Sequence, residues 1–466
     1  MEITLLSNFN NILEFECSAF KIFYNISNAK MVSIKKEYLK YKSMFFEKNN
    51  FFEACFNDSD YSKVIISVNL TSSCNLRCKY CFNSEKASVK LSIDEIKSFI
   101  SYIISTKLNA SKYFVDFAGS GEPLLYIKDI IELAQYCRCL SDRIGKEITP
   151  MLSTNGILLT PKYVSMLQNN GVLFGVSLDG YKELHNKYRV DIRENPTFDI
   201  VKENIMKIKF NDYVGGSMTI VDSSTDIFRA YMEMSKLFKT ISIRPARMSY
   251  ANFDFTYIKR GYDIFIEYLI EKTLMKDLSL LYCIINGDDL LGKTILKIIS
   301  NSKLNRRCEA GIARFSLGID NKIYPCAPAS CHKELEISKN QIEKGENNYY
   351  FDPYPKKCEN CMARNTCGSD CYVQLFENSL NDNLCEFKKY IFLISIYFCG
   401  QIEMTNYDIY CEVVNMANNI IDRSHQDEEL NRLFLKCSHR YSFTKLKKIK
   451  DTNGDRYNRI LKKYNV

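Results

Sequence analysis

The sequence has no apolar run long enough to cross a bilayer as a helix, which takes about 20 residues. The apolar run from Phe392 to Cys399 is far shorter, and we expect it in the core of the fold. The opening residues contain no basic segment followed by a long apolar stretch, so we expect no secretory signal. With 46% hydrophobic and 25% charged residues, the composition is also not that of a disordered chain. These absences favour a folded cytoplasmic protein without a membrane segment.

Length and charge set further bounds. The 466 residues suffice for two or three domains with a sizeable core. The formal net charge of +8 is mild, although basic residues gather beyond Arg432. Such a run is typical of a solvated helix face, and an acidic leader peptide is an alternative partner. Nucleic acid is a poorer fit, because the sequence has no aromatic stacking motif and no recognisable reading helix.

The 19 cysteines are many, and their number is odd. In a chain without a secretory signal they indicate metal ligation in a reducing cytoplasm rather than a disulfide framework. Cys74, Cys78 and Cys81 follow the apolar run 64–70, so we expect them on a loop at the carboxyl end of a strand. Iron–sulfur clusters usually have four thiolate ligands, and a loop with three would leave one iron open. Half of a closed zinc site is the alternative.

Strand-like apolar runs alternate with helical patterns from Val64 to about Pro245. Helices fit between the strands, for instance Ser92–Thr106, where Ser92 can cap the start. Six such units predict an α/β fold with a parallel sheet and crossover helices. The predicted strands are 64–70, Tyr113–Ala118, Ile148–Ser153, Leu173–Leu178, Ser217–Val221 and Ile241–Arg244.

Small polar and charged residues follow these strands, at the edge where barrel enzymes place their chemistry. Glycines there let the backbone approach a ligand, a carboxylate can accept from an ammonium, and a guanidinium pairs with a carboxylate. Each signal alone is ordinary turn chemistry, but their order along the chain is informative. The residues are Gly119, Ser120, Gly121 and Glu122 after the second strand, Ser153 and Asn155 after the third, and Ser177, Asp179 and Arg189 after the fourth.

The C-x3-C-x2-C spacing, with Tyr80 before the last cysteine, resembles the signature of radical S-adenosylmethionine (SAM) enzymes. This resemblance implies a partial (β/α)6 TIM-like barrel in which the three cysteines hold a 4Fe-4S cluster and SAM chelates the fourth iron. It also implies that Tyr80 borders the adenine and that Ser177 and Arg189 contact SAM. Residues 120–123 resemble the family's Gly-Gly-Glu-Pro motif, which holds the SAM amino group, with Ser120 in place of the first glycine.

A second group of cysteines resembles the SPASM domain, an extension of radical SAM enzymes that binds two auxiliary 4Fe-4S clusters. Asn321 stands where that pattern has glycine, and asparagine tolerates the left-handed backbone that a turn there needs. Two zinc ribbons are the alternative. The resemblance assigns Cys308, Cys326 and Cys371 to the first auxiliary cluster, and Cys358, Cys361, Cys367 and Cys385 to the second. Cys331 is the candidate fourth ligand of the first cluster, and an open iron that binds a substrate thiolate is the alternative.

These patterns divide the chain into five parts. They are an N-terminal extension at 1–60 that caps the barrel or recognises a leader peptide, the radical SAM barrel at 61–250, a helical connector at 251–305, the SPASM domain at 306–387 and a basic helical extension at 388–466. The connector shows no motif that carries chemistry.

The resemblance implies that electron transfer to SAM generates a 5′-deoxyadenosyl radical, which takes a hydrogen atom from the substrate. We expect a maturase that installs thioether links in a cysteine-rich precursor peptide with a leader. A ferredoxin or flavodoxin would supply low-potential electrons. The alternatives are carbon–carbon crosslinking and formylglycine formation as in anaerobic sulfatase maturases. Ala327 disfavours the last, because those enzymes carry an aspartate there. A non-enzyme alternative is an iron–sulfur redox or regulatory protein that binds nucleic acid.

Overall fold

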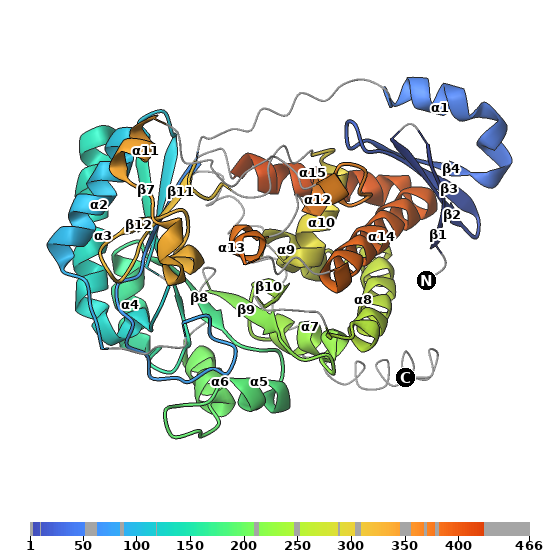
Figure 1. The fold of residues 1–466 in the computed structure, drawn as a ribbon. Coiled ribbons are helices and arrows are strands. Elements are labelled where there is room, and N and C mark those ends of the chain that lie inside the picture. Colours follow the sequence, from blue (N-terminus) through green and yellow to red (C-terminus); the bar gives the residue numbers. More distant parts are fainter. Residues whose placement is uncertain are drawn as a thin grey trace.

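Two sheets organise the structure, a computed structural model. It describes residues 3–9, 11–51, 63–83, 88–117, 119–208, 214–246, 252–287, 289–302, 309–344, 356–367, 371–377 and 382–423. The larger sheet has eight strands in the order β10-β9-β8-β7-β6-β5-β11-β12, and the smaller has the order β1-β2-β3-β4. Figure 1 shows the large sheet with its helices on one side of the molecule and the small sheet at the other.

The six predicted strands form one continuous parallel run in the large sheet. The α/β prediction is therefore confirmed. Crossover helices pack on the sheet through their buried apolar faces, as expected for parallel strands. The strands are β5 (Lys63–Val68), β6 (Lys112–Asp116), β7 (Glu147–Thr154), β8 (Leu173–Ser177), β9 (Val214–Ile220) and β10 (Thr240–Pro245). The helices between them are α2 (Ile93–Thr106), η2 (Pro123–Tyr126), α3 (Ile127–Ile144), α4 (Pro161–Asn169), α5 (Lys182–Tyr188), α6 (Phe198–Lys207) and α7 (Ile227–Ser235).

Helix α2 begins where the sequence predicts. The Ser92 hydroxyl accepts from the Glu95 backbone, and the Glu95 carboxylate accepts from the Ser92 backbone. This reciprocal pair satisfies two of the N–H groups that a helix start leaves without partners.

A hairpin built around the turn expected at Asn321 extends the large sheet, and its pairing with the barrel was not predicted. β11 (Arg314–Leu317) pairs with β5 in the parallel sense, and β12 (Ile323–Tyr324) pairs with β11 in the antiparallel sense. The turn between them contains Asn321 with φ of 62°, so the left-handed conformation expected there is confirmed. The cysteine-rich segment is thus joined to the barrel through a shared sheet.

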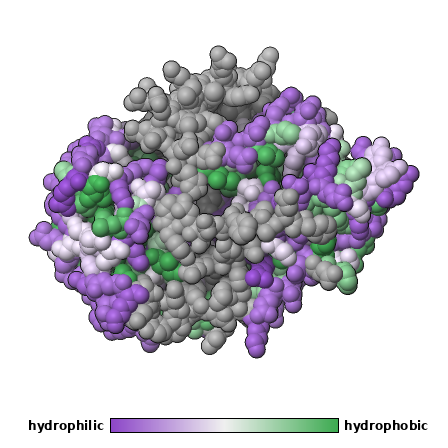
Figure 2. All heavy atoms as spheres, turned by 90° about the horizontal axis from the view of Figure 1, so that it is seen from above, coloured by the Kyte–Doolittle hydropathy of each residue, from purple (hydrophilic) through white to green (hydrophobic). Residues whose placement is uncertain are grey.

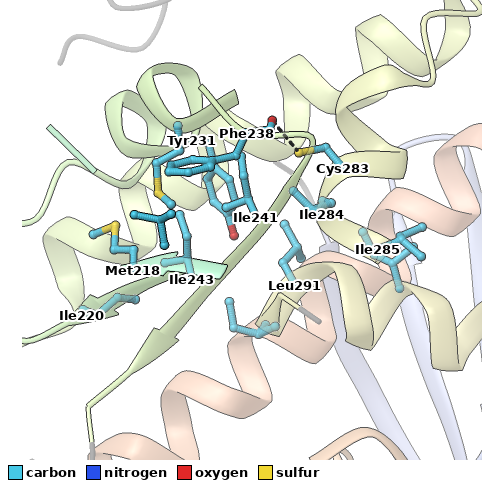
Figure 3. Close-up of a cluster of buried hydrophobic side chains, with 14 of the residues drawn as sticks. Met218, Ile220, Tyr231, Phe238, Ile241, Ile243, Cys283, Ile284, Ile285 and Leu291 are labelled. Atoms are coloured by element: carbon cyan, nitrogen blue, oxygen red, sulfur yellow. Dashed lines mark hydrogen bonds between the residues drawn. The ribbon is translucent and has the colours of Figure 1, made fainter. Parts of the chain in front are cut away.

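Three helices follow β10, namely α8 (Thr256–Leu274), α9 (Ser279–Asn286) and α10 (Leu290–Ile299). The sequence predicts the first and the third. Figure 3 shows Ile241 and Ile243 of β10 packed toward Ile284 of α9 and Leu291 of α10. Cys283 is buried, and its thiol contacts the carbonyl oxygen of Phe238 at 3.8 Å.

Several short helices follow, and two long helices then end the described part of the chain. Residues Phe392–Cys399 lie in α14 and are buried or half-buried, so their expected place in the core is confirmed. The basic run beyond Arg432 lies outside the described residues. The elements are η3 (Ala327–Cys331), η4 (Lys333–Leu335), α11 (Lys339–Lys344), η5 (Lys356–Cys358), α12 (Arg364–Cys367), α13 (Tyr372–Phe376), α14 (Asp382–Thr405) and α15 (Tyr407–Arg423).

The N-terminal extension is a four-stranded antiparallel sheet with a short helix. One face packs on α14, where Phe15 and Tyr24 contact Phe392, and the other lies under the short helix α1. Leu6 and Phe9 on the edge strand β1 are exposed. Recognition of a leader peptide by this extension stays a prediction. The elements are β1 (Ile3–Phe9), β2 (Ile12–Cys17), β3 (Phe20–Asn25), β4 (Met31–Lys35), η1 (Lys36–Tyr41) and α1 (Lys42–Lys48).

On the face shown in Figure 2, hydrophilic residues dominate the described surface, and the hydrophobic residues form small separate groups. None of the described helices combines the length and apolarity needed to cross a membrane.

Candidate active site

The cysteine loop begins just beyond the carboxyl end of β5. Backbone hydrogen bonds hold it against the segment that follows α5: the Arg77 N–H donates to the Val190 carbonyl oxygen at 2.8 Å, and the Lys79 N–H donates to that of Tyr188 at 3.0 Å. These bonds place the loop beside Arg189, which the sequence predicts as a cofactor contact.

The three predicted cluster ligands lie near one another. Cys74, Cys78 and Cys81 are half-buried. Burial raises the pKa of Cys78, the Arg189 guanidinium lowers it, and the charges of Asp179 and the two other cysteines raise it. Arg189 Nη1 lies 4.0 Å from Cys78 Sγ. A cation therefore stands beside a thiol that must ionise before it can bind a metal.

The 119–122 loop packs directly on the residues that lead into the cysteine loop. A Cβ on Gly121 would collide with the Ser73 carbonyl oxygen, and one on Gly119 would collide with the Asn69 side chain. Gly121 is therefore needed because the two backbones approach too closely there for a side chain, whereas a side chain at position 119 would displace that of Asn69.

Glu122 is buried, and its carboxylate is held by three donors. These are the Thr154 hydroxyl at 2.7 Å, the Asn155 N–H at 2.8 Å and the Leu124 N–H at 3.0 Å. Burial raises the pKa of Glu122, and these hydrogen bonds counteract the rise. A carboxylate has about four acceptor positions, so one is left for an ammonium group. The predicted SAM contact of Glu122 stays a prediction.

Asn155 and Ser120 tie two strand-end loops to the region of the cysteine loop. The Asn155 amide donates to Asn75 Oδ1 at 2.7 Å and lies 3.9 Å from Cys74 Sγ. The Ser120 carbonyl oxygen accepts from the Asn83 amide at 2.8 Å. The strand-end loops and the cysteine loop thus support one another.

Asp179 connects three elements of the site. Its carboxylate accepts from the Tyr80 hydroxyl at 2.6 Å, from Arg189 Nε at 2.9 Å and from the Thr219 N–H at 3.1 Å. The Asp179 and Arg189 side chains are only 1% and 10% exposed. Burial lowers the pKa of Arg189, but the charges of Asp179, Tyr80 and Cys78 and the hydrogen bond to Asp179 together raise it by more. Since Nε serves Asp179, the terminal nitrogens of Arg189 can reach another anion.

His185 and Thr197 support this pair, and the sequence reasoning missed both. The Asp179 N–H donates to His185 Nδ1 at 3.2 Å, and His185 Nε2 lies 3.0 Å from the Thr197 hydroxyl. That hydroxyl donates to the Arg189 carbonyl oxygen at 2.6 Å, so Nε2 must carry the proton. Burial and the Arg189 charge lower the pKa of His185 to about 4. A neutral histidine therefore fixes the backbone at both ends of the ion pair. The sequence pattern of small polar residues after the strands does not indicate this role of His185.

The two predicted serines lie near the ends of adjacent strands. Ser177 is half-buried, with its hydroxyl 3.4 Å from that of Ser217, and Ser153 is exposed. The structure thus brings the predicted cofactor residues to one edge of the sheet, as their order along the chain suggests.

Comparison with known proteins gives the family. The model of the Radical SAM superfamily matches residues 68–223, which include the cysteine loop and the strand-end residues described above. Residues 68–223 of the chain therefore form a radical SAM domain.

Relatives of this radical SAM enzyme include anaerobic sulfatase-maturating enzymes. The cysteine-type enzyme of Clostridium novyi (strain NT) is 26% identical over 360 residues, which are 69% of this chain and 92% of the relative. The serine-type enzyme of Bacteroides thetaiotaomicron is 30% identical over 159 residues, or 32% of this chain and 37% of the relative. In fold, the chain is similar to native anSMEcpe with bound AdoMet and Cp18Cys peptide. That likeness has a TM-score of 0.57 and 19% identity, and it covers 77% of this chain and 99% of the other.

Radical SAM enzymes use SAM and a 4Fe-4S cluster, and the residues present fit both groups. Three thiols lie together on one loop, which matches a cluster with one open iron. A buried guanidinium beside them suits the SAM carboxylate, and Glu122 keeps an acceptor position for an ammonium.

The cysteines predicted for the second auxiliary cluster also lie together in this radical SAM enzyme. Burial first, and then the charges of Cys361, Cys367 and Cys385, raise the pKa of Cys358 to about 11. The four come from η5, the turn after it, α12 and α14. Four thiolates are the usual ligand set of a 4Fe-4S cluster, although within the described residues no three such side chains already stand in metal-coordinating positions.

The first auxiliary set is only partly described. Cys326 is buried in a small cluster against which Cys371 packs, and Cys308 lies outside the described residues. Cys331 is exposed, and its Sγ lies 3.8 Å from the carbonyl oxygen of Phe82, the residue after Cys81. Cys331 therefore lies beside the cysteine loop.

Proposed function

We propose that this radical SAM enzyme oxidises a cysteine or serine side chain within a peptide or protein to formylglycine. The observation that supports this most is a similarity that spans 92% of a sulfatase-maturating enzyme rather than the barrel alone. The sequence pattern favours a thioether link, but the relatives support the formylglycine alternative better, since none of those described above is a thioether maturase.

The chain's own residues would bind and orient the cofactor. When bound, the cluster and SAM supply hydrogen-atom abstraction from the substrate. Cys74, Cys78 and Cys81 would ligate the cluster, and Arg189 would bind the SAM carboxylate with the terminal nitrogens that Asp179 leaves available. Because the guanidinium is buried and anchored before SAM arrives, little ordering of this side chain is needed on binding.

A thioether link is the second candidate, and one observation favours it. Ala327 stands where sulfatase maturases carry the aspartate proposed to accept a substrate proton, and a methyl group cannot accept one. Formylglycine formation would therefore need another base.

One assay separates the two candidates. The reconstituted protein is incubated without oxygen with SAM, a reductant and a synthetic peptide that spans the target cysteine of an anaerobic sulfatase. We expect the peptide to lose its sulfur and gain an aldehyde that hydrazine reagents trap. Loss of two hydrogen atoms with the sulfur retained would favour the thioether. An unchanged cysteine peptide and an unchanged serine variant would contradict formylglycine formation.

We also propose that Cys331 completes the first auxiliary cluster. A Cys331→Ala variant is expected to keep both other clusters and to lose iron after anaerobic reconstitution, because a cubane with only three protein ligands is less well held. Iron analysis and Mössbauer spectra of the variant and the wild type measure this. Cys139→Ala, an exposed cysteine on α3, is the control. Unchanged iron in Cys331→Ala would show that the fourth iron is open.

A further inference from the structure

Helix α10 presents a lysine to the four-cysteine site formed by Cys358, Cys361, Cys367 and Cys385. Lys297 Nζ donates to the Thr366 carbonyl oxygen at 2.9 Å, and Thr366 directly precedes Cys367. Helix α10 packs against α12, which carries both residues, and Figure 1 shows the two helices side by side. A helix that the sequence pattern treats as a plain connector therefore places a cation next to a predicted cluster ligand.

Lys297 is half-buried, and two exposed cations, Lys293 and Arg244, lie near it. Burial first, and then the charges of Lys293 and Arg244, lower the pKa of Lys297 to about 7, and a negative charge on Cys367 opposes this change. The structure therefore places a lysine where two other positive charges oppose its ionisation, and where negative charge at Cys367 would favour it. An anionic group at the four-cysteine site would stabilise this arrangement.

Two more lysines face the same four cysteines, but each has a carboxylate partner near the surface. Lys357 lies 3.3 Å from Asp382, and Lys389 lies 2.6 Å from Glu386. Their side chains are 41% and 36% exposed. Solvent and these carboxylates screen both charges, whereas Lys297 is half-buried and donates to a backbone carbonyl.

We propose that Lys297 is the counter-charge of the four-cysteine site and raises the reduction potential of a 4Fe-4S cluster bound there. This inference rests on the proposed auxiliary cluster. Four thiolates around a cluster core leave net negative charge, and reduction adds one more. A cation in a low-dielectric surrounding stabilises the reduced form more than the oxidised form.

In this role, the cluster would accept one of the electrons that the reaction removes from the substrate. Oxidation of the substrate removes two electrons. One leaves with the hydrogen atom that the SAM-derived group takes, and the other must go to an acceptor. A cluster whose potential Lys297 raises would accept that second electron in a one-electron reduction.

The test is a redox titration of the full-length reconstituted protein, followed by electron paramagnetic resonance. The signal that disappears in Cys361→Ala identifies the four-cysteine site. In Lys297→Met, the ratio of reduced to oxidised cluster at a fixed potential is expected to fall about tenfold, which is about 59 mV for a one-electron couple. Lys297→Arg keeps the charge and is expected to keep the midpoint. Lys389→Met, a screened charge four residues after Cys385, is expected to shift it less.

The outcomes separate the proposal from the function on which it rests. A Lys297→Met variant with full iron and an unchanged midpoint overturns the role of Lys297 and leaves the auxiliary cluster intact. If Cys361→Ala loses neither iron nor signal, the four-cysteine cluster itself is wrong. Should Lys297→Met lose the cluster, retention in Lys297→Arg supports a need for the charge. Loss in both variants overturns the proposal.

Discussion

Replacement of Cys78 by alanine is expected to reduce 5′-deoxyadenosine formation to the level measured without enzyme. Cys78 lies with Cys74 and Cys81 and beside the Arg189 guanidinium, so its loss removes one of three cluster ligands at the centre of the site. A 4Fe-4S cluster with two protein ligands is poorly held. Anaerobic reconstitution, iron and zinc analysis and an assay for 5′-deoxyadenosine measure the effect.

The matched control for this variant is Cys137→Ala. Cys137 is fully buried on α3 in the apolar core, where its thiol packs as a small hydrophobic group. This variant is expected to keep its iron and its turnover of SAM, with a small loss of stability. Wild-type activity in Cys78→Ala would contradict the assigned ligand set. Zinc instead of iron in the wild type would support the alternative of a closed zinc site.

The second large effect is expected from Asp179→Ala. This change leaves the buried Arg189 guanidinium without the carboxylate that holds Nε, and removal of one partner from a buried pair typically costs roughly 3–5 kcal/mol. It also removes the acceptor of the Tyr80 hydroxyl. Thermal unfolding of the reconstituted protein and equilibrium binding of SAM are the measurements, and both stability and affinity are expected to fall.

An exposed ion pair nearby provides the comparison. Asp199 lies 2.6 Å from Lys182, and their side chains are 67% and 55% exposed. Asp199→Ala is expected to cost less than about 1 kcal/mol, because solvent already screens such a pair. Equal losses in Asp179→Ala and Asp199→Ala would mean that the Asp179–Arg189 pair does not organise the site.

The features that could be predicted from the sequence are those that depend on residues close to one another along the chain. The six barrel strands carry apolar runs of strand length, Ser92 and Glu95 form a local cap, and Asn321 occupies a turn that needs positive φ. The strand-end residues could be grouped because parallel strands deliver their carboxyl ends to one edge.

What could not be predicted depends on contacts between distant segments. The four residues of β11 show no strand signal of their own, and their pairing with β5 joins segments about 250 residues apart. The fold brings His185 to Asp179 and Lys297 to Thr366. The spacing of apolar residues along the sequence does not indicate which distant residues become neighbours in this way. The position of the N-terminal sheet on α14 is unpredictable for the same reason.

The pairing of β11 with β5 has a mechanical consequence. The backbone N–H of Asn69 donates to the carbonyl oxygen of Leu317 at the end of β11. Asn69 lies one residue beyond β5 and five residues before Cys74, the first cysteine of the loop. Any movement of the β11–β12 hairpin away from the barrel would have to break the hydrogen bonds between β11 and β5. We therefore expect the β11–β12 hairpin to keep its position beside the cysteine loop when a substrate binds.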